Sequence, residues 1–290
     1  MIVVRKIEEL KQLVRQAKVE EKQIGLVPTM GYFHEGHLSL MRRAKAENDL
    51  VIVSLFVNPV QFGPNEDLSV YPRDEARDRA LAESVGVDWL FIPEVAEMYP
   101  PGYQTFTEVT EISQGLCGAS RPGHFRGVAT VVQKLLNLTE AERAYFGEKD
   151  AQQLRVIRQM VADLNLTVQV IGCPIVRESD GLALSSRNVF LSTAERQAAL
   201  ILSQVLAAAE DLLAGGLREA GQLVSQLQPM LAAEPLATLD YLAIVDSRTL
   251  QPVQKLQGEI LIALAVKIGR TRLIDNRVYS LEEKNVATNV

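Results

Sequence analysis

Residues 24–44 read IGLVPTMGYFHEGHLSLMRRA, and this stretch sets the expected fold. A short apolar run at residues 24–27 comes first, a glycine-containing turn follows, and an amphipathic run then carries Leu38, Met41 and Ala44. This order is typical of a strand, a turn and a helix. Strand–turn–helix is also the unit from which open α/β sheets are built.

The turn at residues 28–37 holds His34 and His37, and the chain has 3 histidines in all. Backbone N–H groups are free at a helix start, and the helix dipole is positive there. We therefore expect an anion site, and two imidazoles beside it suggest phosphate chemistry. A zinc pair and a purely structural role are alternatives, although the protease pattern H-E-x-x-H fails because residue 38 is leucine.

Apolar runs alternate with helical patterns through residue 175. Strands are expected at residues 24–27, 50–57, 87–92, 144–146 and 167–171, and helices near residues 7–17, 75–86, 126–138 and 151–162. This alternation predicts βαβ units in a doubly wound parallel sheet.

The pattern changes after residue 175. Ser192 and Glu195 form a capping box before a long helix that should end at residues 215–216. A second helix is expected at residues 217–233, with strands at 239–245 and 259–268, and the polar end from residue 282 is expected to fray. We predict a domain of residues 1–175 and a smaller α+β domain of residues 176–290.

Composition narrows the class of protein. The chain has 290 residues, 47% of them hydrophobic, and a net charge of −6, which argues against a nucleic-acid partner. The apolar run at residues 50–57 is too short to span a bilayer, and Arg5 interrupts the apolar start, so neither a membrane partner nor a signal peptide is expected. Cys117 and Cys173 cannot form a disulfide framework, so we expect a cytoplasmic protein.

Polar clusters follow several expected strands, at the edge where open parallel sheets bind ligands. The amides of Asn58 and Gln61 could grip a hydroxyl or a carboxylate. Lys149 could neutralise phosphate oxygens, and Asp150 could hold Mg²⁺. Taken alone, the Asn58–Gln61 cluster is equally consistent with a turn, and an exposed charged turn is the better interpretation of residues 147–150.

Residues 185–187 place two hydroxyls, Ser185 and Ser186, beside Arg187, which would suit a polyphosphate. A simpler interpretation is that this cluster is the segment leading into the N-terminus of a helix. Neither G-x-x-x-x-G-K-[ST] nor G-x-G-x-x-G occurs in the chain, so the commonest kinase and dehydrogenase signatures are absent.

Taken together, the motifs closely resemble those of the pantothenate synthetase (pantoate–β-alanine ligase) family, within the H-x-G-H nucleotidyltransferase-like superfamily. The similarity covers nearly the whole chain in the expected order. The motifs read PTMGYFHEGH at 28–37, FVNPVQF at 56–62, YPR at 71–73, GHFRGV at 123–128, YFGEKD at 145–150, LSSRN at 184–188 and RLIDN at 272–276.

The resemblance implies a Rossmann-like ATP-binding domain, related to that of class I aminoacyl-tRNA synthetases, and a smaller domain that closes over the nucleotide. It implies an enzyme of the coenzyme A precursor pathway that adenylates pantoate with ATP and then passes the pantoyl group to β-alanine. AMP and pyrophosphate leave. It also implies Mg²⁺ with ATP and a homodimer formed through the first domain.

Carried over position by position, the resemblance assigns catalytic roles to His37, His34, Lys149 and Arg187, and pantoate contacts to Gln61, Gln153 and Asn58. Asp150 would meet the Mg²⁺ on the ATP phosphates. The expected ATP-binding residues are Met30, Gly31, Tyr32, Phe33, His34, Glu35, Gly36, His37, Gly147, Glu148, Lys149, Asp150, Val176, Leu184, Ser185, Ser186 and Arg187.

Two rival functions remain at this point. A nucleotidyltransferase shares the H-x-G-H turn and would transfer a nucleotide to a phosphate. A nucleotide-binding regulator would show no ATP turnover, although the many charged and amide groups after strands disfavour it. A tRNA-charging role is disfavoured by the acidic balance of the chain.

Overall fold

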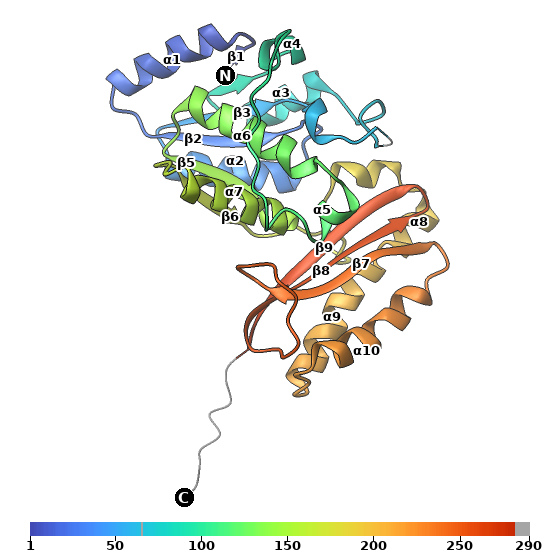
Figure 1. The fold of residues 1–290 in the computed structure, drawn as a ribbon. Helices are drawn as coiled ribbons and strands as arrows, with labels where there is room; N and C mark the ends of the chain where they lie inside the picture. Colours follow the sequence, from blue (N-terminus) through green and yellow to red (C-terminus); the bar gives the residue numbers. More distant parts are fainter. Residues whose placement is uncertain (65, 282–290) are drawn as a thin grey trace, which may run out of the picture. The chain divides into compact units, whose positions relative to one another are not determined.

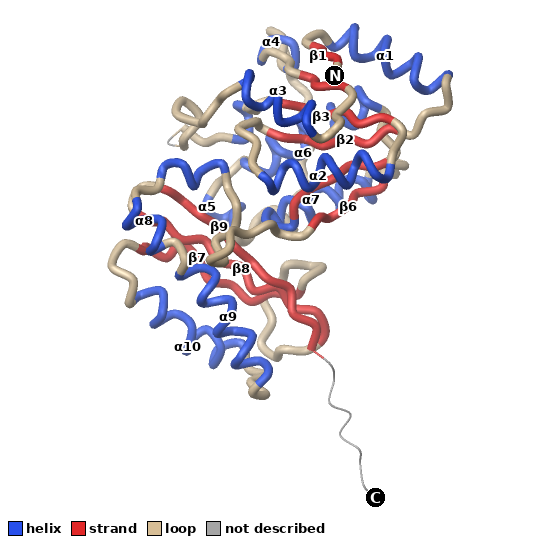
Figure 2. The backbone as a smooth tube through the Cα atoms, turned by 180° about the vertical axis from the view of Figure 1, so that it is seen from behind, coloured by secondary structure: helices blue, strands red, loops and turns tan. Residues whose placement is uncertain are grey.

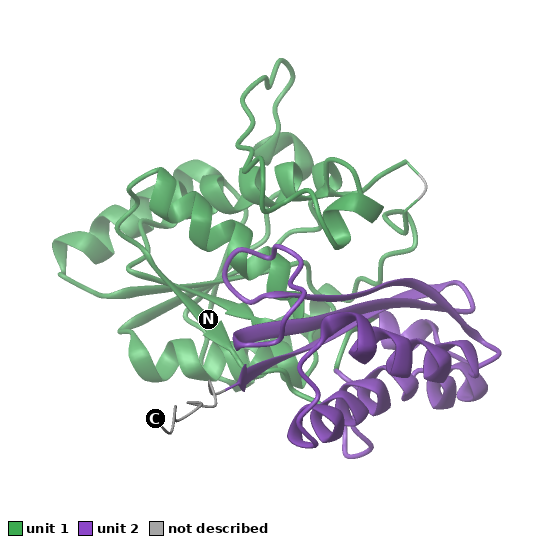
Figure 3. Cartoon of the chain, turned by 60° about the horizontal axis from the view of Figure 1, so that its bottom comes forward, with its two compact units in different colours: residues 1–177, 184–186 green, residues 178–183, 187–290 purple. Residues whose placement is uncertain are grey.

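The computed structural model describes residues 1–64 and 66–281, and these residues form two compact units (Figure 3). Unit 1 comprises Met1–Arg177 and Leu184–Ser186, and unit 2 comprises Glu178–Ala183 and the chain from Arg187 onward. The chain therefore passes between the units after residues 177, 183 and 186. The expected boundary at residue 175 lies two residues before the first of these crossings.

Unit 1 is built on a six-stranded sheet in the order β1-β4-β3-β2-β5-β6, and every pairing is parallel. The strands are β1 (Ile2–Val4), β2 (Ile24–Thr29), β3 (Leu50–Leu55), β4 (Trp89–Phe91), β5 (Arg143–Gly147) and β6 (Gln169–Cys173). Val51, Ile52 and Val53 are fully buried, as expected for a strand covered on both faces.

Helices cover both faces of this sheet (Figures 1 and 2). Parallel crossovers are right-handed, so α2 (Glu35–Glu47) and α3 (Glu75–Ser84) lie on one face. The helices α1 (Ile7–Val19), α6 (His124–Thr139) and α7 (Ala151–Asp163) lie on the other. Short helices complete the unit: α4 (Val95–Met98), α5 (Cys117–Ser120), η1 (Pro59–Gln61) and η2 (Glu148–Asp150).

The order of the strands places the site. β2 and β5 are neighbours, with Gly25 beside Arg143 and Leu26 beside Ala144. From β2 the chain winds toward β3 and β4, whereas from β5 it winds the opposite way toward β6. The turns after β2 and β5 therefore flank the point where the winding direction reverses, which is where open α/β sheets bind ligands.

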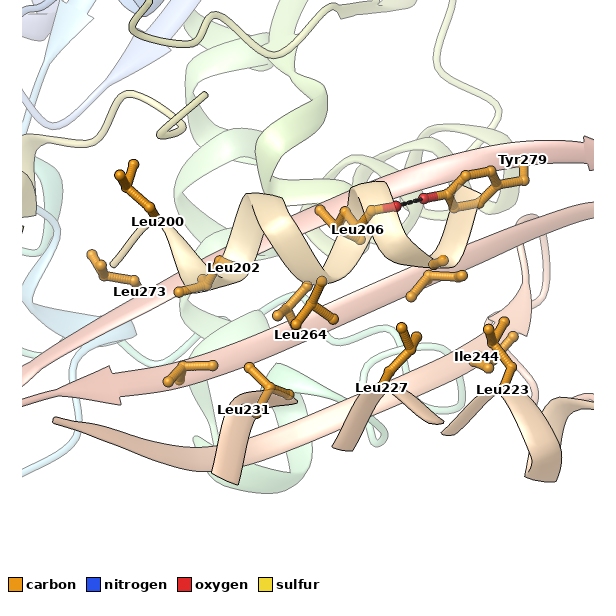
Figure 4. Packing of buried hydrophobic residues seen from close by; sticks show 14 of the residues in the cluster. Leu200, Leu202, Leu206, Leu223, Leu227, Leu231, Ile244, Leu264, Leu273 and Tyr279 are labelled. Atoms are coloured by element: carbon orange, nitrogen blue, oxygen red, sulfur yellow. Dashed lines mark hydrogen bonds between the residues drawn. The ribbon is translucent and has the colours of Figure 1, made fainter. Parts of the chain in front are cut away.

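Unit 2 pairs an antiparallel sheet with helices on one face. The sheet has the order β7-β8-β9, from β7 (Ala237–Asp246), β8 (Gly258–Ile268) and β9 (Thr271–Leu281). Alternate residues of β8, including Ile262 and Leu264, pack with leucines of α9 (Ile201–Ala214) and α10 (Ala220–Ala232) (Figure 4). The Tyr279 hydroxyl donates to the Leu206 carbonyl at 2.6 Å and ties β9 to α9.

The segment Thr193–Ala214 is long and apolar enough to cross a membrane by length and composition. In unit 2, however, Leu202, Val205 and Leu206 of this segment are buried in the core with α10 and the sheet. A core helix passes the same test of composition, so the segment is accounted for by packing within the unit.

The predicted architecture, a doubly wound parallel sheet with a smaller α+β domain, is confirmed. Some details were wrong. The single long helix after Ser192 is two helices, α8 (Thr193–Ala198) and α9, and its capping box forms as predicted. β1 and β9 were not predicted as strands. The expected fraying from residue 282 concerns residues outside the described part of the chain.

Candidate active site

The turn after β2 has an unusual main chain. Gly31 has a φ of +84° and Tyr32 a φ of +53°, so two successive residues lie in the left-handed region. Glycine adopts it readily, whereas tyrosine there costs about 1–2 kcal/mol. Gly36 has a different reason to be glycine, because a Cβ would lie 2.9 Å from Nδ1 of the His34 ring.

The backbone donors of this turn are largely occupied by the protein itself. Tyr32 and Phe33 both donate N–H bonds to the Asp78 carboxylate, each at 2.6 Å. The N–H of Gly36 goes to His34 Nδ1 at 3.2 Å, and that of His34 goes to His37 Nδ1 at 3.3 Å. The expectation of free N–H groups for an anion is therefore wrong at these positions, because side chains cap them.

This capping decides the protonation of His34 and His37. Each ring accepts an N–H at Nδ1, so a neutral ring must carry its proton on Nε2. In the described part of the chain, neither Nε2 has a hydrogen-bond partner. The two rings lie 4.1 Å apart between centroids. The turn thus presents two neighbouring imidazole N–H donors.

Both imidazoles are held neutral. Burial, with Lys149 and Arg77 nearby, lowers the pKa of His34 to about 4, while Asp150 opposes this shift. Burial likewise lowers the pKa of His37 well below its ordinary value, and His34 and Lys149 add to the effect. These electrostatic effects also show that Lys149 and Asp150, after β5, lie near the turn after β2.

Part of the segment at residues 184–187 lies at the same turn. Ser186 Oγ donates to the Tyr32 carbonyl at 3.3 Å, and Leu184 N–H donates to the Val176 carbonyl at 3.0 Å. Leu184 also packs beside Gly36. Ser185 belongs to unit 1 with these residues, whereas Arg187 belongs to unit 2.

Gln61 is fixed by Asn58. The buried Asn58 amide donates to Gln61 Oε1 at 3.0 Å and to the Gly127 carbonyl at 3.1 Å, and its oxygen accepts from Val60 N–H at 3.3 Å. Gln61 Nε2 contacts Met30 Sδ at 3.2 Å, which places it beside the turn. Because its oxygen already accepts one bond from Asn58, Gln61 keeps an N–H donor and one further acceptor position for a ligand.

The third histidine, His124, holds the main chain of Gln61. His124 Nε2 lies 3.0 Å from an Arg121 nitrogen, and since arginine only donates, this ring nitrogen accepts. His124 Nδ1–H therefore donates to the Gln61 carbonyl at 2.9 Å. Arg121 also binds Glu66 at 2.5 Å. Burial, and next Arg121, lower the pKa of His124 to about 4.

Two adjacent glutamines on α7 differ in their contacts. Gln152 is buried and bonds the Cys117 N–H at 2.9 Å and the carbonyls of Ile112 and Gly115 at 3.1 and 2.7 Å. Gln153 is half-buried, and its amide has no hydrogen-bond partner among the described residues. Gln153 is thus the glutamine with donors and acceptor to spare.

Asp78, Arg121 and Gln152 were missed by the sequence analysis. Asp78 carried a signal, because it lies four residues before the buried Ala82 and so falls on the buried side of α3. A carboxylate at such a position needs partners. Gln152 and Arg121 had no comparable signal, since Gln152 bonds the main chain 35–40 residues away and the Arg121 ion pair with Glu66 spans 55 residues.

Within the described residues, no group of three or more His, Cys, Asp and Glu side chains could hold a metal ion. With Nδ1 of both His34 and His37 already accepting N–H bonds, the zinc alternative has no support.

A doubly wound sheet with paired imidazoles, a lysine and an acid at its reversal point is a nucleotide-binding α/β enzyme domain. The comparisons with known proteins agree. The chain belongs to the pantoate–β-alanine ligase family, whose family model matches residues 2–278.

The relatives support this membership at high coverage. The pantothenate synthetase of Heliobacterium modesticaldum is 59% identical over 278 residues, covering 96% of this chain and 99% of the relative. The crystal structure of pantothenate synthetase from Thermus thermophilus matches with a TM-score of 0.91 at 47% identity, covering 96% of this chain and 99% of that one. The Francisella tularensis pantoate–β-alanine ligase, complexed with β-γ ATP and β-alanine, matches with a TM-score of 0.79 at 39% identity, covering 96% and 97%.

Proposed function

We propose that this chain condenses (R)-pantoate with β-alanine at the expense of ATP, through a pantoyl-adenylate intermediate. Membership of the family makes the chain a ligase that forms a C–N bond and produces pantothenate. The observation that carries the mechanism is the pair of neutral imidazoles, with Nε2–H unspent, beside Lys149.

In the first step a pantoate carboxylate oxygen attacks the α-phosphorus of ATP, and the bond from that phosphorus to the bridging oxygen breaks. Negative charge grows on the departing pyrophosphate. The Nε2–H groups of His37 and His34 and the Lys149 ammonium would stabilise this charge, more in the transition state than in bound ATP. The donors are already fixed by capping, so little reorganisation is needed.

Asp150 fits the expected Mg²⁺. Magnesium bound with nucleotides takes one or two carboxylates and otherwise phosphate oxygens and water, so a single acid after β5 is sufficient. Asp150 is exposed, and its charge acts on both His34 and His124, which supports its assignment to this site. Mg²⁺ would neutralise charge on the phosphates.

Pantoate would lie between Gln61 and Gln153. Gln61 keeps an N–H donor and one acceptor position, and the Gln153 amide offers both donors and an acceptor, so both side chains suit a carboxylate or a hydroxyl. We propose that Asn58, whose amide is already used inside the protein, orients Gln61 rather than the substrate. In the second step the β-alanine amine attacks the acyl carbon and AMP leaves, so no protein nucleophile is required.

The remaining ATP contacts extend along the same turns. We propose that they involve residues 30–37, Gly147, Glu148, Val176, Leu184–Ser186 and Arg187. Ser186 and Leu184 already contact Tyr32 and pack beside Gly36, which supports their assignment.

Incubation with ATP, Mg²⁺, pantoate and β-alanine, followed by product identification by mass, tests the proposal. We expect pantothenate, AMP and pyrophosphate only when both acids are present, with pantoate-dependent ATP–pyrophosphate exchange when β-alanine is omitted. Transfer of a nucleotide to a phosphate acceptor would instead indicate the nucleotidyltransferase. Absence of any ATP turnover would favour the regulator.

We also propose a cytoplasmic homodimer formed through unit 1, without a nucleic-acid or membrane partner, as the family resemblance and the acidic composition suggest. Light scattering of the purified protein measures its mass directly. A monomeric mass at assay concentration would contradict the dimer.

A further inference from the structure

The turn at residues 30–34 holds a main-chain shape that its sequence does not favour by itself. Gly31 and Tyr32 both have positive φ, and Tyr32, unlike glycine, carries a Cβ. Residues with a Cβ rarely adopt this region, and a shape of this kind persists only where its surroundings impose it.

Asp78, on α3, supplies the restraint. It is 1% exposed, and its two oxygens accept from two successive main-chain donors. Oδ2 accepts from Tyr32 N–H and Oδ1 from Phe33 N–H, each at 2.6 Å. Successive N–H groups in such a turn form a concave site for an anion, and here the anion is the protein's own carboxylate.

The main-chain contacts dominate the environment of this carboxylate. Arg77 approaches Oδ1 only to 4.0 Å. Burial raises the pKa of Asp78, and the N–H groups of Phe33 and Tyr32 oppose this rise. Gly31 completes the fit, because a Cβ there would lie 3.0 Å from Oδ2. A buried charge committed to two backbone donors is best explained by the turn that it holds.

The main chain of this turn also fixes the positions of the two histidine rings. His34 follows Phe33 directly and caps α2, and His37 Nδ1 accepts the His34 N–H. The Phe33 ring packs against the His37 ring with centroids 5.6 Å apart. A shift of the main chain at residues 32–33 would therefore displace both imidazoles.

We propose that Asp78 is a positioning residue for ATP, which acts by fixing the main chain that presents His34 and His37. This inference rests on the proposed function, because it takes the turn to be the ATP site. Asp78 does not touch the nucleotide in this scheme.

The test is Asp78→Asn, which keeps the shape but turns one N–H acceptor into an NH₂ donor. We expect the KM for ATP to rise about tenfold and the rate of pantoate-dependent ATP–pyrophosphate exchange to fall about 10²-fold, the effect of a misplacement of about 1 Å. The KM for pantoate should stay unchanged. Asp78→Glu, which keeps the charge but shifts the oxygens, is a second variant and should change the same parameters.

Asp74→Ala is the matched control. Asp74 caps the same helix, accepts from Arg77 N–H at 3.0 Å and is exposed, so its loss weakens α3 without touching the turn. Amide hydrogen exchange separates the two roles. Asp78→Asn should speed exchange at residues 32–33 while the sheet stays protected, and Asp74→Ala should speed exchange in α3.

Wild-type kinetics and exchange in both Asp78 variants would overturn the inference. So would a uniform loss of protection across unit 1 with an unchanged KM for ATP, since that would mark a general structural role. If the wild-type protein itself made no pantothenate, the proposed function would fail separately. ATP binding by calorimetry, with local exchange, would then decide the role of Asp78.

Discussion

The turn at residues 30–37 and the segment at residues 121–127 both hold neutral, half-buried histidines, yet they use the rings in opposite ways. In the turn, His34 and His37 accept at Nδ1, and among residues 1–64 and 66–281 neither Nε2–H has a partner. In the segment, His124 commits both ring nitrogens, one to the Gln61 carbonyl and one to Arg121.

The contrast gives a criterion for assigning roles. A polar group whose hydrogen bonds are all made inside the protein holds something else in place, whereas a group with an unspent donor can act on a ligand. Gln152 and Gln153, adjacent on α7, differ in the same way.

His37→Ala should have the largest effect. It removes one of the two unspent N–H donors, and we expect the rate of pantoate-dependent ATP–pyrophosphate exchange to fall on the order of 10²-fold or more, by analogy with the loss of one oxyanion donor. Stopped assays with labelled pyrophosphate measure it. Near-normal exchange would remove His37 from the chemistry.

Gln153→Ala should raise the KM for pantoate about tenfold, since hydrogen bonds to charged groups contribute about 1.5–3 kcal/mol, and should leave the KM for ATP unchanged. Gln152→Ala is the control, because its three contacts are within the protein. It should lower the melting temperature and spare the KM for pantoate. If Gln152→Ala raised the KM for pantoate and Gln153→Ala only lowered the melting temperature, the two assignments would be reversed.

His124→Ala should raise the KM for pantoate roughly fivefold, because about 1 kcal/mol of support for the Gln61 main chain is lost. At saturating pantoate, the rate of ATP–pyrophosphate exchange should remain near that of the wild type. Arg126→Ala, an exposed change on the same helix turn, serves as the control. A loss of rate as deep as that of His37→Ala would show that His124 acts on the reaction itself.

The smallest effect concerns pH. A histidine in the unfolded chain has a pKa of about 6.5, whereas burial lowers the pKa of His34 and His124 to about 4 in the folded protein. As pH falls through this window the unfolded chain binds protons that the folded protein does not, so stability falls with pH. Above about 6.5 the histidines cause no further change.

Each such histidine contributes a slope of at most about 1.4 kcal/mol per pH unit. Urea unfolding between about pH 6.5 and 5 measures this slope of the unfolding free energy with pH. His124→Asn should lower the slope by the contribution of one histidine. An identical slope in wild type and variant would mean that His124 is protonated in the folded protein.

Much of the fold was predictable from local patterns. The apolar run of β3 and the helical stripe of α1 were recognisable because burial imposes a period on the sequence. The break between α8 and α9 was not, because Ala199 and Leu200 carry no helix-breaking signal and both keep helical main-chain angles. β9 was missed because the polar Asp275 and Asn276 interrupt its apolar pattern, although both are buried where β9 pairs with β8.

The sequence by itself determined the order of strands and helices, the H-x-G-H turn and the family to which the chain belongs, because these depend on residue types at fixed spacing along one segment. Only the tertiary structure decided that Asp78 restrains the turn, which nitrogen of each histidine carries the proton, and which glutamine is left with an unspent amide. Those properties depend on hydrogen bonds between segments tens of residues apart, and spacing along the chain carries no record of them.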